Sequence, residues 1–281
     1  MRILVLNPNT SAAMTAEIAA AARSAAHPDN EIVCMSPHFG SVAIDSAAES
    51  YLSAVGVMDL AARLTRTGDF DFDAVILAGF GEHGRDALAE MLAVPVFDIA
   101  ECAAHVAHLI GRRFSVITTL ARSIPPIEDR LLLAGLNAHC ASVRACGLST
   151  ADVDADLAGA VQAIVDEAAR AINEDDADVI CLGCAGMAGA TAAISAKLGV
   201  PAVDGVTAAV ALAQAIVGLG LSTSKTGVFA PGPDNPRSHW PLSEAIDSSR
   251  ERSSEAIEPS RERSSEAIEP SRKRSSEAPG S

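Results

Sequence analysis

Cys184 is the residue of this chain whose type and setting best suit acid–base chemistry. It follows the apolar run Val179–Leu182 in the stretch "DVICLGCAGMAG" and precedes a predicted helix. A thiol at the N-terminus of a helix feels the positive end of the helix dipole, which predicts a lowered pKa. The amides of Ala185 and Gly186 are placed to hold a developing oxyanion. The alternative is a small cysteine that packs as a hydrophobe.

An internal repeat gives Cys184 a counterpart. The stretch "DAVILAGFGEHG", Asp73–Gly84, has the same pattern, and aligning the two on their aspartates sets Gly79 opposite Cys184 and Gly81 opposite Gly186. Both copies continue with a helix, "VP", a short strand, an aspartate and another helix. The repeat predicts two similar α/β lobes related by a pseudo-twofold axis, with a thiol in only one of them.

Short apolar runs alternate with amphipathic patterns along most of the chain. Strands are predicted at Arg2–Leu6, Glu31–Met35, Ala74–Ala78, Val94–Phe97, Phe114–Thr118, Ala141–Ala145, Val179–Leu182 and Val200–Val203. Helices are predicted at Ala12–Ala26, Glu49–Thr67, Ala87–Met91, Ile99–Ile110, Ile127–Ala134, Asp154–Glu174, Gly189–Leu198 and Gly205–Gly218. Strands that are apolar throughout and separated by helices indicate parallel sheets flanked by helices. The two aspartates that precede helices, Asp98 and Asp204, are expected to be N-caps.

The loops after four strands are expected to meet in one cleft between the lobes, because ligands of open α/β sheets lie beyond the carboxyl ends of strands. The residues this brings together are Asn7, Asn9, Thr10, Gly79–Gly81, Thr118, Thr119 and Cys184–Gly186. Their amide and hydroxyl groups suit a polar ligand, uncharged or carboxylate. The alternative for "NPNT" and "ITT" is turn formation and helix capping, with Thr10 or Ser11 as the N-cap before Ala12.

Two further residues are weaker candidates. His83 lies in the turn after Gly79 and is suited to proton transfer near neutral pH, although a lone loop histidine is usually solvated. Phe39 belongs to a predicted loop over the cleft and is a candidate wall for the ligand.

Composition excludes several classes of function. A net charge of −15, without a basic patch, argues against nucleic-acid binding. No apolar stretch is long enough for a membrane span or a signal peptide, so we expect a cytoplasmic protein with reduced cysteines. Cys181 and Cys184 form a CxxC, but strand geometry directs them to opposite faces and no second ligand pair follows, so neither a metal nor a redox pair is expected. "GFGEHG" alone is a weak dinucleotide signal, and no cofactor is predicted.

The chain divides into three predicted segments. Residues 1–96 with about 205–232 form the first lobe, and residues 97–204 form the second. Residues 233–281 repeat "RERSSEAIEPS" with an 11-residue period and too little apolar content to pack, which predicts a disordered tail.

Several blocks from Met1 to about Gly232 resemble the aspartate/glutamate/hydantoin racemase superfamily, and within it the hydantoin and allantoin racemases. They are "LNPNTS", "RRFSVITTLARS", "LGCAGMA", "VPAVDGV" and "GLGLSTSKTG". The resemblance implies a two-lobed α/β fold and a cofactor-independent enzyme acting on a small molecule. It also implies two cysteines on opposite sides of the substrate: one removes the proton alpha to a carbonyl and the other returns a proton to the opposite face.

In this chain the second family cysteine matches Cys184, whereas the first position is occupied by Gly79. One hypothesis is a racemase whose second acid–base group is His83 or a water. A second is a single-cysteine lyase, similar to arylmalonate decarboxylase in the same superfamily. A third is a ureide-binding protein with impaired catalysis. A homo-oligomer is compatible with the alanine-rich helices.

Overall fold

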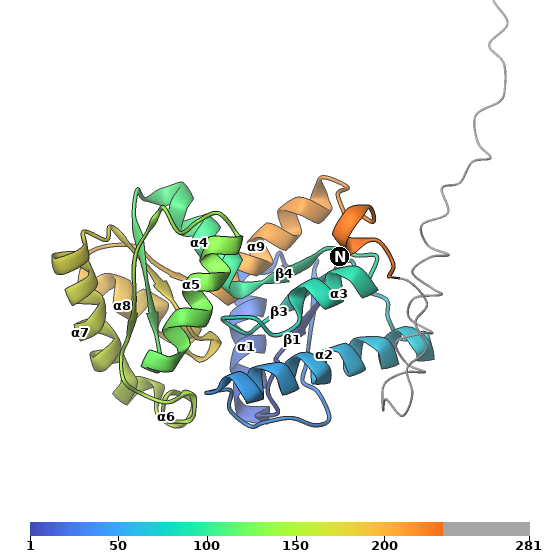
Figure 1. The fold of residues 1–281 in the computed structure, drawn as a ribbon, viewed down its shortest axis with the longest axis horizontal. Coiled ribbons are helices and arrows are strands. Elements are labelled where there is room, and N and C mark those ends of the chain that lie inside the picture. The colour runs from blue at the N-terminus through green and yellow to red at the C-terminus, as the bar shows by residue number, and fades with distance from the viewer. Residues whose placement is uncertain (233–281) are drawn as a thin grey trace, which may run out of the picture.

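The computed structural model describes residues 1–232, which fold into alternating strands and helices (Figure 1). The predicted tail, residues 233–281, lies outside the described residues. The elements of the first half are β1 (Arg2–Leu6), α1 (Ala12–Ala25), β2 (Glu31–Met35), α2 (Ala47–Thr67), β3 (Ala74–Leu77), α3 (Arg85–Met91), β4 (Val96–Asp98) and α4 (Ile99–Ile110). Those of the second half are β5 (Phe114–Thr118), α5 (Ile124–Leu133), β6 (Cys140–Ala145), α6 (Thr150–Ala155), α7 (Leu157–Asp175), β7 (Val179–Leu182), α8 (Thr191–Leu198), β8 (Ala202–Asp204) and α9 (Gly205–Gly218). Short 3₁₀ helices are η1 (Ala121–Ser123), η2 (Ala185–Ala190) and η3 (Gly227–Phe229).

The strands form two four-stranded sheets with the same order. The first is β2-β1-β3-β4 and the second is β6-β5-β7-β8, and every pairing is parallel. The sheets lie in separate halves of the molecule (Figure 1). The prediction of an α/β fold with two similar lobes is therefore confirmed, and the carboxyl ends of corresponding strands are equivalent positions. The exact lobe boundaries remain a prediction.

Three apolar cores account for this arrangement. The largest lies between the sheets and combines β1 and β3 with β5 and β7 through α1, α4, α5 and α9. A second core covers the outer face of the first sheet with α2 and α3, and a third covers the second sheet with α7 and α8. Both faces of each sheet are covered, which explains strands such as β3 and β7 that are buried along their whole length.

The two halves meet closely where α4 and α9 begin. A Cβ at Gly205 would lie only 2.3 Å from the carbonyl oxygen of Ile99, so no larger residue fits there without moving the backbone. Just before these positions, Asp98 Oδ1 accepts a hydrogen bond from Glu101 N, and Asp204 Oδ1 accepts one from Thr207 N, both at 2.8 Å. The predicted N-cap roles of both aspartates are confirmed.

The structure corrects two predicted helices. The helix expected over Asp154–Glu174 is two helices, because Ser149 caps α6 in a capping box and Asp156 caps α7 through Gly159 N. The helix expected from Gly189 begins at Thr191 and is preceded by η2. Most other element ends lie within one or two residues of the prediction, although α5 begins at Ile124, three residues before the predicted start.

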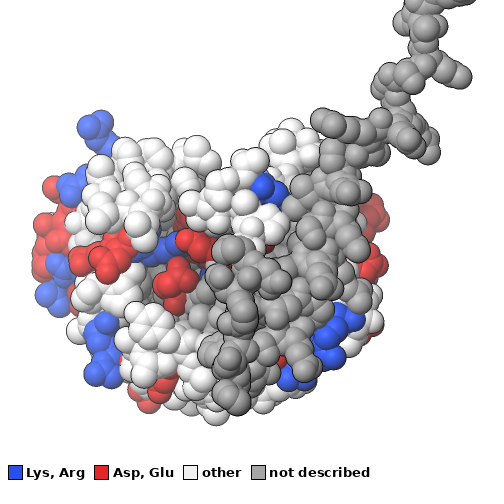
Figure 2. Space-filling view, turned by 45° about the vertical axis from the view of Figure 1, so that its right-hand side comes forward, with Lys and Arg blue, Asp and Glu red and all other residues white. Residues whose placement is uncertain are grey.

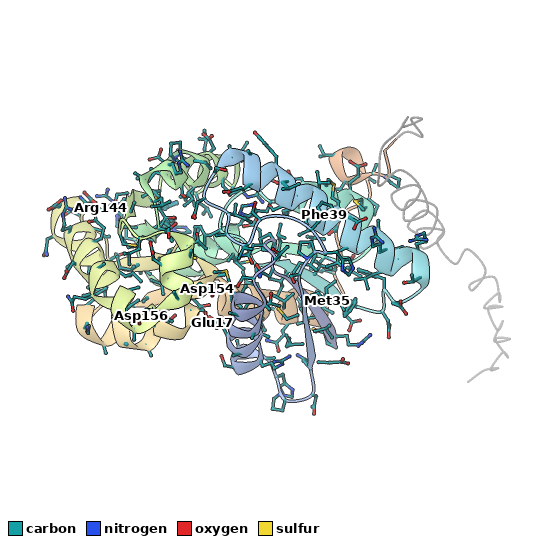
Figure 3. All side chains as sticks on the ribbon, turned by 90° about the horizontal axis from the view of Figure 1, so that it is seen from below. Glu17, Met35, Phe39, Arg144, Asp154 and Asp156 are labelled. Atoms are coloured by element: carbon teal, nitrogen blue, oxygen red, sulfur yellow. The ribbon has the colours of Figure 1, made fainter. Side chains whose placement is uncertain are left out.

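Polar contacts also join the halves at the edge of the inner core. Ser11 Oγ, which caps α1, donates to Asp154 Oδ2 on α6 at 3.0 Å, and Thr150 Oγ1 donates to Asp45 Oδ1 at 2.7 Å. Figure 3 shows Asp154 beside Glu17 of α1 at this junction. The N-cap expected at Thr10 or Ser11 is Ser11.

Acidic and basic side chains are interspersed over the face seen in Figure 2, rather than gathered into one patch. Within residues 1–232, no helix is both long and apolar enough to cross a membrane.

Candidate active site

A cavity of about 70 Å³ lies where the carboxyl ends of β1, β3, β5 and β7 meet. Both halves contribute to its wall. The lining residues are Asn7, Pro8, Asn9, Met14, Ile44, Ala78, Gly79, Phe80, His83, Thr118, Thr119, Ser123, Thr150, Gly183, Cys184 and Ala185. The predicted cleft between the lobes is thus present, with Gly79 contributed by the first half and Cys184 by the second.

The wall of this cavity carries amides, hydroxyls, one imidazole and one thiol. Among the residues that the structure describes, no lysine, arginine, aspartate or glutamate lines it. The site is therefore built to hold a polar ligand by hydrogen bonds rather than by an opposite charge.

Cys184 is half-buried and stands immediately before η2, as its N-cap residue. Burial raises the pKa of its thiol to about 11, with smaller increases from Asp45 and Asp154, while a hydrogen bond from the amide of Gly186 acts in the opposite direction. The expectation of a lowered pKa is wrong: a single amide and a short 3₁₀ turn do not offset the loss of water around the sulfur. The resting residue is a neutral thiol.

The space beside Gly79 is occupied by His83. A Cβ built on Gly79 would lie 2.2 Å from Cδ2 of His83, 2.9 Å from its Nε2 and 2.8 Å from Cγ of Pro8. A side chain at position 79 and the present position of His83 are therefore mutually exclusive. The imidazole takes the place that the repeat assigns to the counterpart of Cys184.

Two serines of α2 hold the His83 ring. Ser50 Oγ and Ser53 Oγ lie 3.1 and 3.2 Å from His83 Nδ1. Each hydroxyl proton is directed to a backbone carbonyl, because Ser50 Oγ donates to Glu82 O at 2.5 Å and Ser53 Oγ donates to Ser50 O at 2.7 Å. Both serines must then accept from His83, which places the proton on Nδ1 and leaves the lone pair on Nε2, the atom nearer Gly79 and Gly81.

His83 is 7% exposed, so the interpretation of a solvated loop histidine is wrong. Burial lowers the pKa of its imidazole to about 4, although the charge of Asp98 acts in the opposite direction. At neutral pH the ring is uncharged and able to accept a proton at Nε2.

Asn7 and Asn9 form a fixed pair at the end of β1. Asn7 Nδ2 donates to Asn9 Oδ1 at 2.7 Å and to Thr15 Oγ1 at 2.9 Å, and Asn9 Oδ1 also accepts from Ser11 N at 2.9 Å. These bonds orient the amide of Asn9, whose Nδ2 has, within residues 1–232, only the thioether of Met14 as a hydrogen-bond partner. Because sulfur is a weak acceptor, this amide retains donor capacity toward the cavity.

Thr118 and Thr119 supply hydroxyls from the end of β5. Thr118 Oγ1 makes a long bond of 3.4 Å to Gly183 O, and the Thr119 hydroxyl makes no hydrogen bond within residues 1–232. An unpaired hydroxyl in the wall of a polar cavity is suited to a ligand carbonyl or N–H.

Comparison with known proteins shows the family of the chain. The profile of the Asp/Glu/Hydantoin racemase family matches residues 3–213, which is most of the described chain. The chain belongs to that family. The expectation of a racemase-type isomerase is confirmed at the level of the family.

Individual members of the racemase family are also similar in sequence and structure. A hydantoin racemase from a Pseudomonas species is 39% identical over 229 residues, covering 82% of this chain and 91% of that protein. The crystal structure of an allantoin racemase from Pseudomonas fluorescens is 51% identical with a TM-score of 0.78, covering 84% of this chain and 99% of that one. The allantoin racemase from Klebsiella pneumoniae is 35% identical with a TM-score of 0.81, covering 87% and 98%.

Most residues predicted for the site of this racemase-family chain line the cavity. They are Asn7, Asn9, Gly79, Phe80, His83, Thr118, Thr119, Cys184 and Ala185. The others lie close to the wall or outside it. A Cβ built on Gly186 would lie 3.8 Å from Sγ of Cys184, and Thr10 N donates to Ser41 O at 3.0 Å. Phe39 is 38% exposed in the loop before α2 (Figure 3) and does not line the cavity, nor does Gly81.

Sequence reasoning missed several residues of the wall. They are Pro8, Met14, Ile44, Ser123, Thr150 and Gly183. Pro8 and Gly183 are next to predicted site residues in the chain, so the same argument from strand ends could have found them. Ile44 had no such signal, because the long loop before α2 is brought to the cavity only by tertiary contacts.

Cys181 lies inside β7, where its thiol faces Ala103 O on α4 at 3.7 Å, away from Cys184. No group of three or more possible metal ligands occurs within the described part of the chain.

Proposed function

We propose that this protein is a cofactor-independent racemase of allantoin or a related hydantoin, in which His83 and Cys184 are the two acid–base groups. The occupation of the space beside Gly79 by His83 is the observation that supports this most directly. Racemisation requires a proton donor or acceptor on each face of a planar intermediate. The cavity wall carries one such group from each half of the molecule.

The protonation states define how the pair works. His83 Nε2, as the free base, removes the proton from the carbon alpha to the carbonyl, and the thiol of Cys184 gives its proton to the opposite face. The product is the opposite enantiomer, and after the reaction His83 is an imidazolium and Cys184 is a thiolate. The opposite enantiomer is processed by the same pair in the reverse direction, or the proton returns through solvent before the next turnover.

Amide and hydroxyl donors support the intermediate. Negative charge develops on the carbonyl oxygen as the alpha proton leaves. Asn9 Nδ2 and the hydroxyl of Thr119 have donor capacity left for that oxygen, and donors held in place before the reaction lower the barrier without a reorganisation cost.

The uncharged wall favours a neutral substrate. A carboxylate substrate such as aspartate would bring its charge into a cavity that no lysine or arginine of residues 1–232 lines, while Asp45 and Asp154 act electrostatically on Cys184. Hydantoins and allantoin are neutral and carry several N–H and C=O groups that match the amides and hydroxyls. The small volume and polar wall favour the ureido group of allantoin over a bulky aromatic substituent.

The test follows the alpha proton of each enantiomer of allantoin in D2O by NMR, with optical rotation recorded on the same sample. Wild type is compared with Cys184→Ser and His83→Ala. We expect wild type to lose rotation while deuterium enters the product enantiomer, and both variants to lose this activity. When two groups act on opposite faces, the proton that is added comes from solvent. Deuterium therefore appears in the product enantiomer before it appears in the unreacted enantiomer.

The other outcomes identify the remaining hypotheses. Exchange with rotation retained would indicate one working face and the single-cysteine lyase, to be followed with malonate-type substrates. Binding without exchange above the buffer rate would indicate a ureide-binding protein. Full activity of His83→Ala would exclude His83 and leave water as the second group.

A further inference from the structure

Arg130 of α5 is a buried cation that the proposed chemistry does not use. It is 7% exposed and contacts carboxylates from three other segments. Its Nη2 pairs with Asp98 Oδ2 at 2.5 Å and with Glu101 Oε2 at 3.2 Å, and its Nη1 lies 3.6 Å from Glu82 Oε2. This cluster connects the second half of the molecule to the turn that carries His83.

The Asp98 side of the cluster is fixed. Asp98 lies at the end of β4, is fully buried as a side chain, and uses its other oxygen to cap α4 through Glu101 N. A buried carboxylate needs both a charge partner and hydrogen bonds, and Arg130 supplies the charge partner through Nε and Nη2. The position of the guanidinium is therefore fixed by Asp98, independently of its ion pair with Glu82.

The Glu82 side of the cluster determines the position of the turn. Glu82 Oε1 accepts from Gly84 N at 2.8 Å, and Glu82 O accepts from Ser50 Oγ at 2.5 Å. With the ion pair from Glu82 Oε2 to Arg130, the residue before His83 is held at three points. Ser50 also contacts the His83 ring, so the position of the turn and that of the imidazole are coupled.

We propose that Arg130 is a positioning residue for the general base, holding the Glu82–Gly84 turn through Glu82 and neutralising Asp98 behind the imidazole. This inference rests on the role of His83 given above. A displacement of about 1 Å of a reacting group can lower a rate about a hundredfold, so an ion pair that fixes the turn has a large effect on the rate.

Electrostatics gives Arg130 a second effect on the same base. Asp98 is the charge that favours the protonated form of His83, and Arg130 faces Asp98 directly. The charged residues that flank His83 in its own segment are Glu82 and Arg85, while α2 contributes the uncharged Ser50 and Ser53 to the ring. Weakening the pair between Arg130 and Asp98 is expected to move the acid limb of activity to higher pH.

The experiment compares two variants that each remove one carboxylate from Arg130. Glu82→Gln keeps an oxygen for Gly84 N but loses the ion pair on the turn, and Glu101→Gln loses an ion pair of the same guanidinium on α4. We expect kcat for allantoin to fall about tenfold in Glu82→Gln, with KM changed less than about twofold, and both constants to stay within about twofold in Glu101→Gln. Far-UV circular dichroism and thermal midpoints check that both variants fold.

A third variant, Arg130→Lys, keeps the charge but not the planar fork that reaches both sides of the cluster. We expect a lower kcat and an acid limb shifted to higher pH. The proposal is overturned by an unchanged kcat in Glu82→Gln, or by equal losses in both glutamine variants, which would assign the effect to charge rather than to the turn. If His83→Ala retains activity, the proposed function fails; if His83→Ala is inactive and Glu82→Gln is fully active, only the role of Arg130 fails.

Discussion

The imidazole of His83 lies where a side chain on Gly79 would project, with Cδ2 only 2.2 Å from the position that a Cβ would take. Glycine at position 79 is therefore the condition for His83 to enter the cavity. The two copies of the internal repeat therefore contribute different groups to the cavity: the first half contributes an imidazole and the second half a thiol.

Replacing His83 with alanine should lower racemisation of allantoin by about a hundred- to ten-thousand-fold, the usual contribution of a general base. Binding should change less, because in the proposed mechanism the imidazole acts on the alpha proton. Polarimetry on single enantiomers measures the rate, and calorimetric titration measures affinity.

Added imidazole provides the control for that variant. The ring removed in His83→Ala leaves space beside Gly79, so free imidazole should restore part of the rate in proportion to its concentration. Cys184→Ser should be equally inactive without any rescue. Rescue of both, or of neither with intact folding, would contradict a specific role of His83 as base.

Introducing a cysteine at position 79, the counterpart of Cys184 in the internal repeat, should by itself lower stability and activity. In Gly79→Cys the new side chain overlaps His83, and overpacking of this kind costs about 1–3 kcal/mol of stability. We expect a lower thermal midpoint and lower activity than wild type, measured by differential scanning calorimetry and polarimetry.

The double variant Gly79→Cys with His83→Ala removes the overlap. It should recover the thermal midpoint lost in Gly79→Cys, and it should racemise faster than His83→Ala because two thiols now face the substrate. A double variant that stays as unstable as Gly79→Cys would show that the overlap is not the cause.

The depressed pKa of His83 predicts a loss of stability in acid. Its folded-state value of about 4 lies below the ordinary value of 6.5, so the unfolded chain binds the proton more readily between these limits. The stability that the neutral ring contributes is present above pH 6.5 and is lost as pH falls toward 4, by up to about 3 kcal/mol. Urea unfolding at pH 7, 5.5 and 4.5 measures this slope, and His83→Gln, which does not titrate, should show a smaller one.

The raised pKa of Cys184 predicts slow alkylation at neutral pH. Burial places the pKa near 11, so the thiolate fraction at pH 7 is small and should grow about tenfold for each unit of pH below that value. Peptide mass spectrometry after timed iodoacetamide treatment measures the rate at this residue. A midpoint of reactivity below about 8.5 would show instead that the amide of Gly186 outweighs burial.

Thr119→Val should raise KM for allantoin without a comparable fall in stability. The hydroxyl makes no hydrogen bond within the described chain, so its loss leaves no protein partner unpaired. A neutral hydrogen bond to the substrate is worth about 0.5–1.5 kcal/mol, which corresponds to about two- to tenfold in KM. The matched control is Thr118→Val, whose hydroxyl has a protein acceptor in Gly183 O.

Much of the fold followed from local pattern. Uninterrupted apolar runs such as Ala74–Leu77 and Val179–Leu182 indicated strands covered on both faces, and the matched copies around Gly79 and Cys184 indicated two equivalent sheets. Asp98 and Asp204 could be predicted as N-caps, because an N-cap depends mainly on the helix that it precedes. The strand-end residues could be predicted to lie at one site, because parallel strands bring their carboxyl ends together.

Tertiary structure decided what these residues do. The sequence alone determined that a thiol is present at position 184 and absent at position 79, but not that a residue four positions further along folds back into the gap. That depends on Ser50 and Ser53, which are about thirty residues away in the chain, and on burial, which the local sequence does not specify. Burial also reversed the predicted direction for the pKa of Cys184, because desolvation is a property of the whole packed site rather than of one helix terminus.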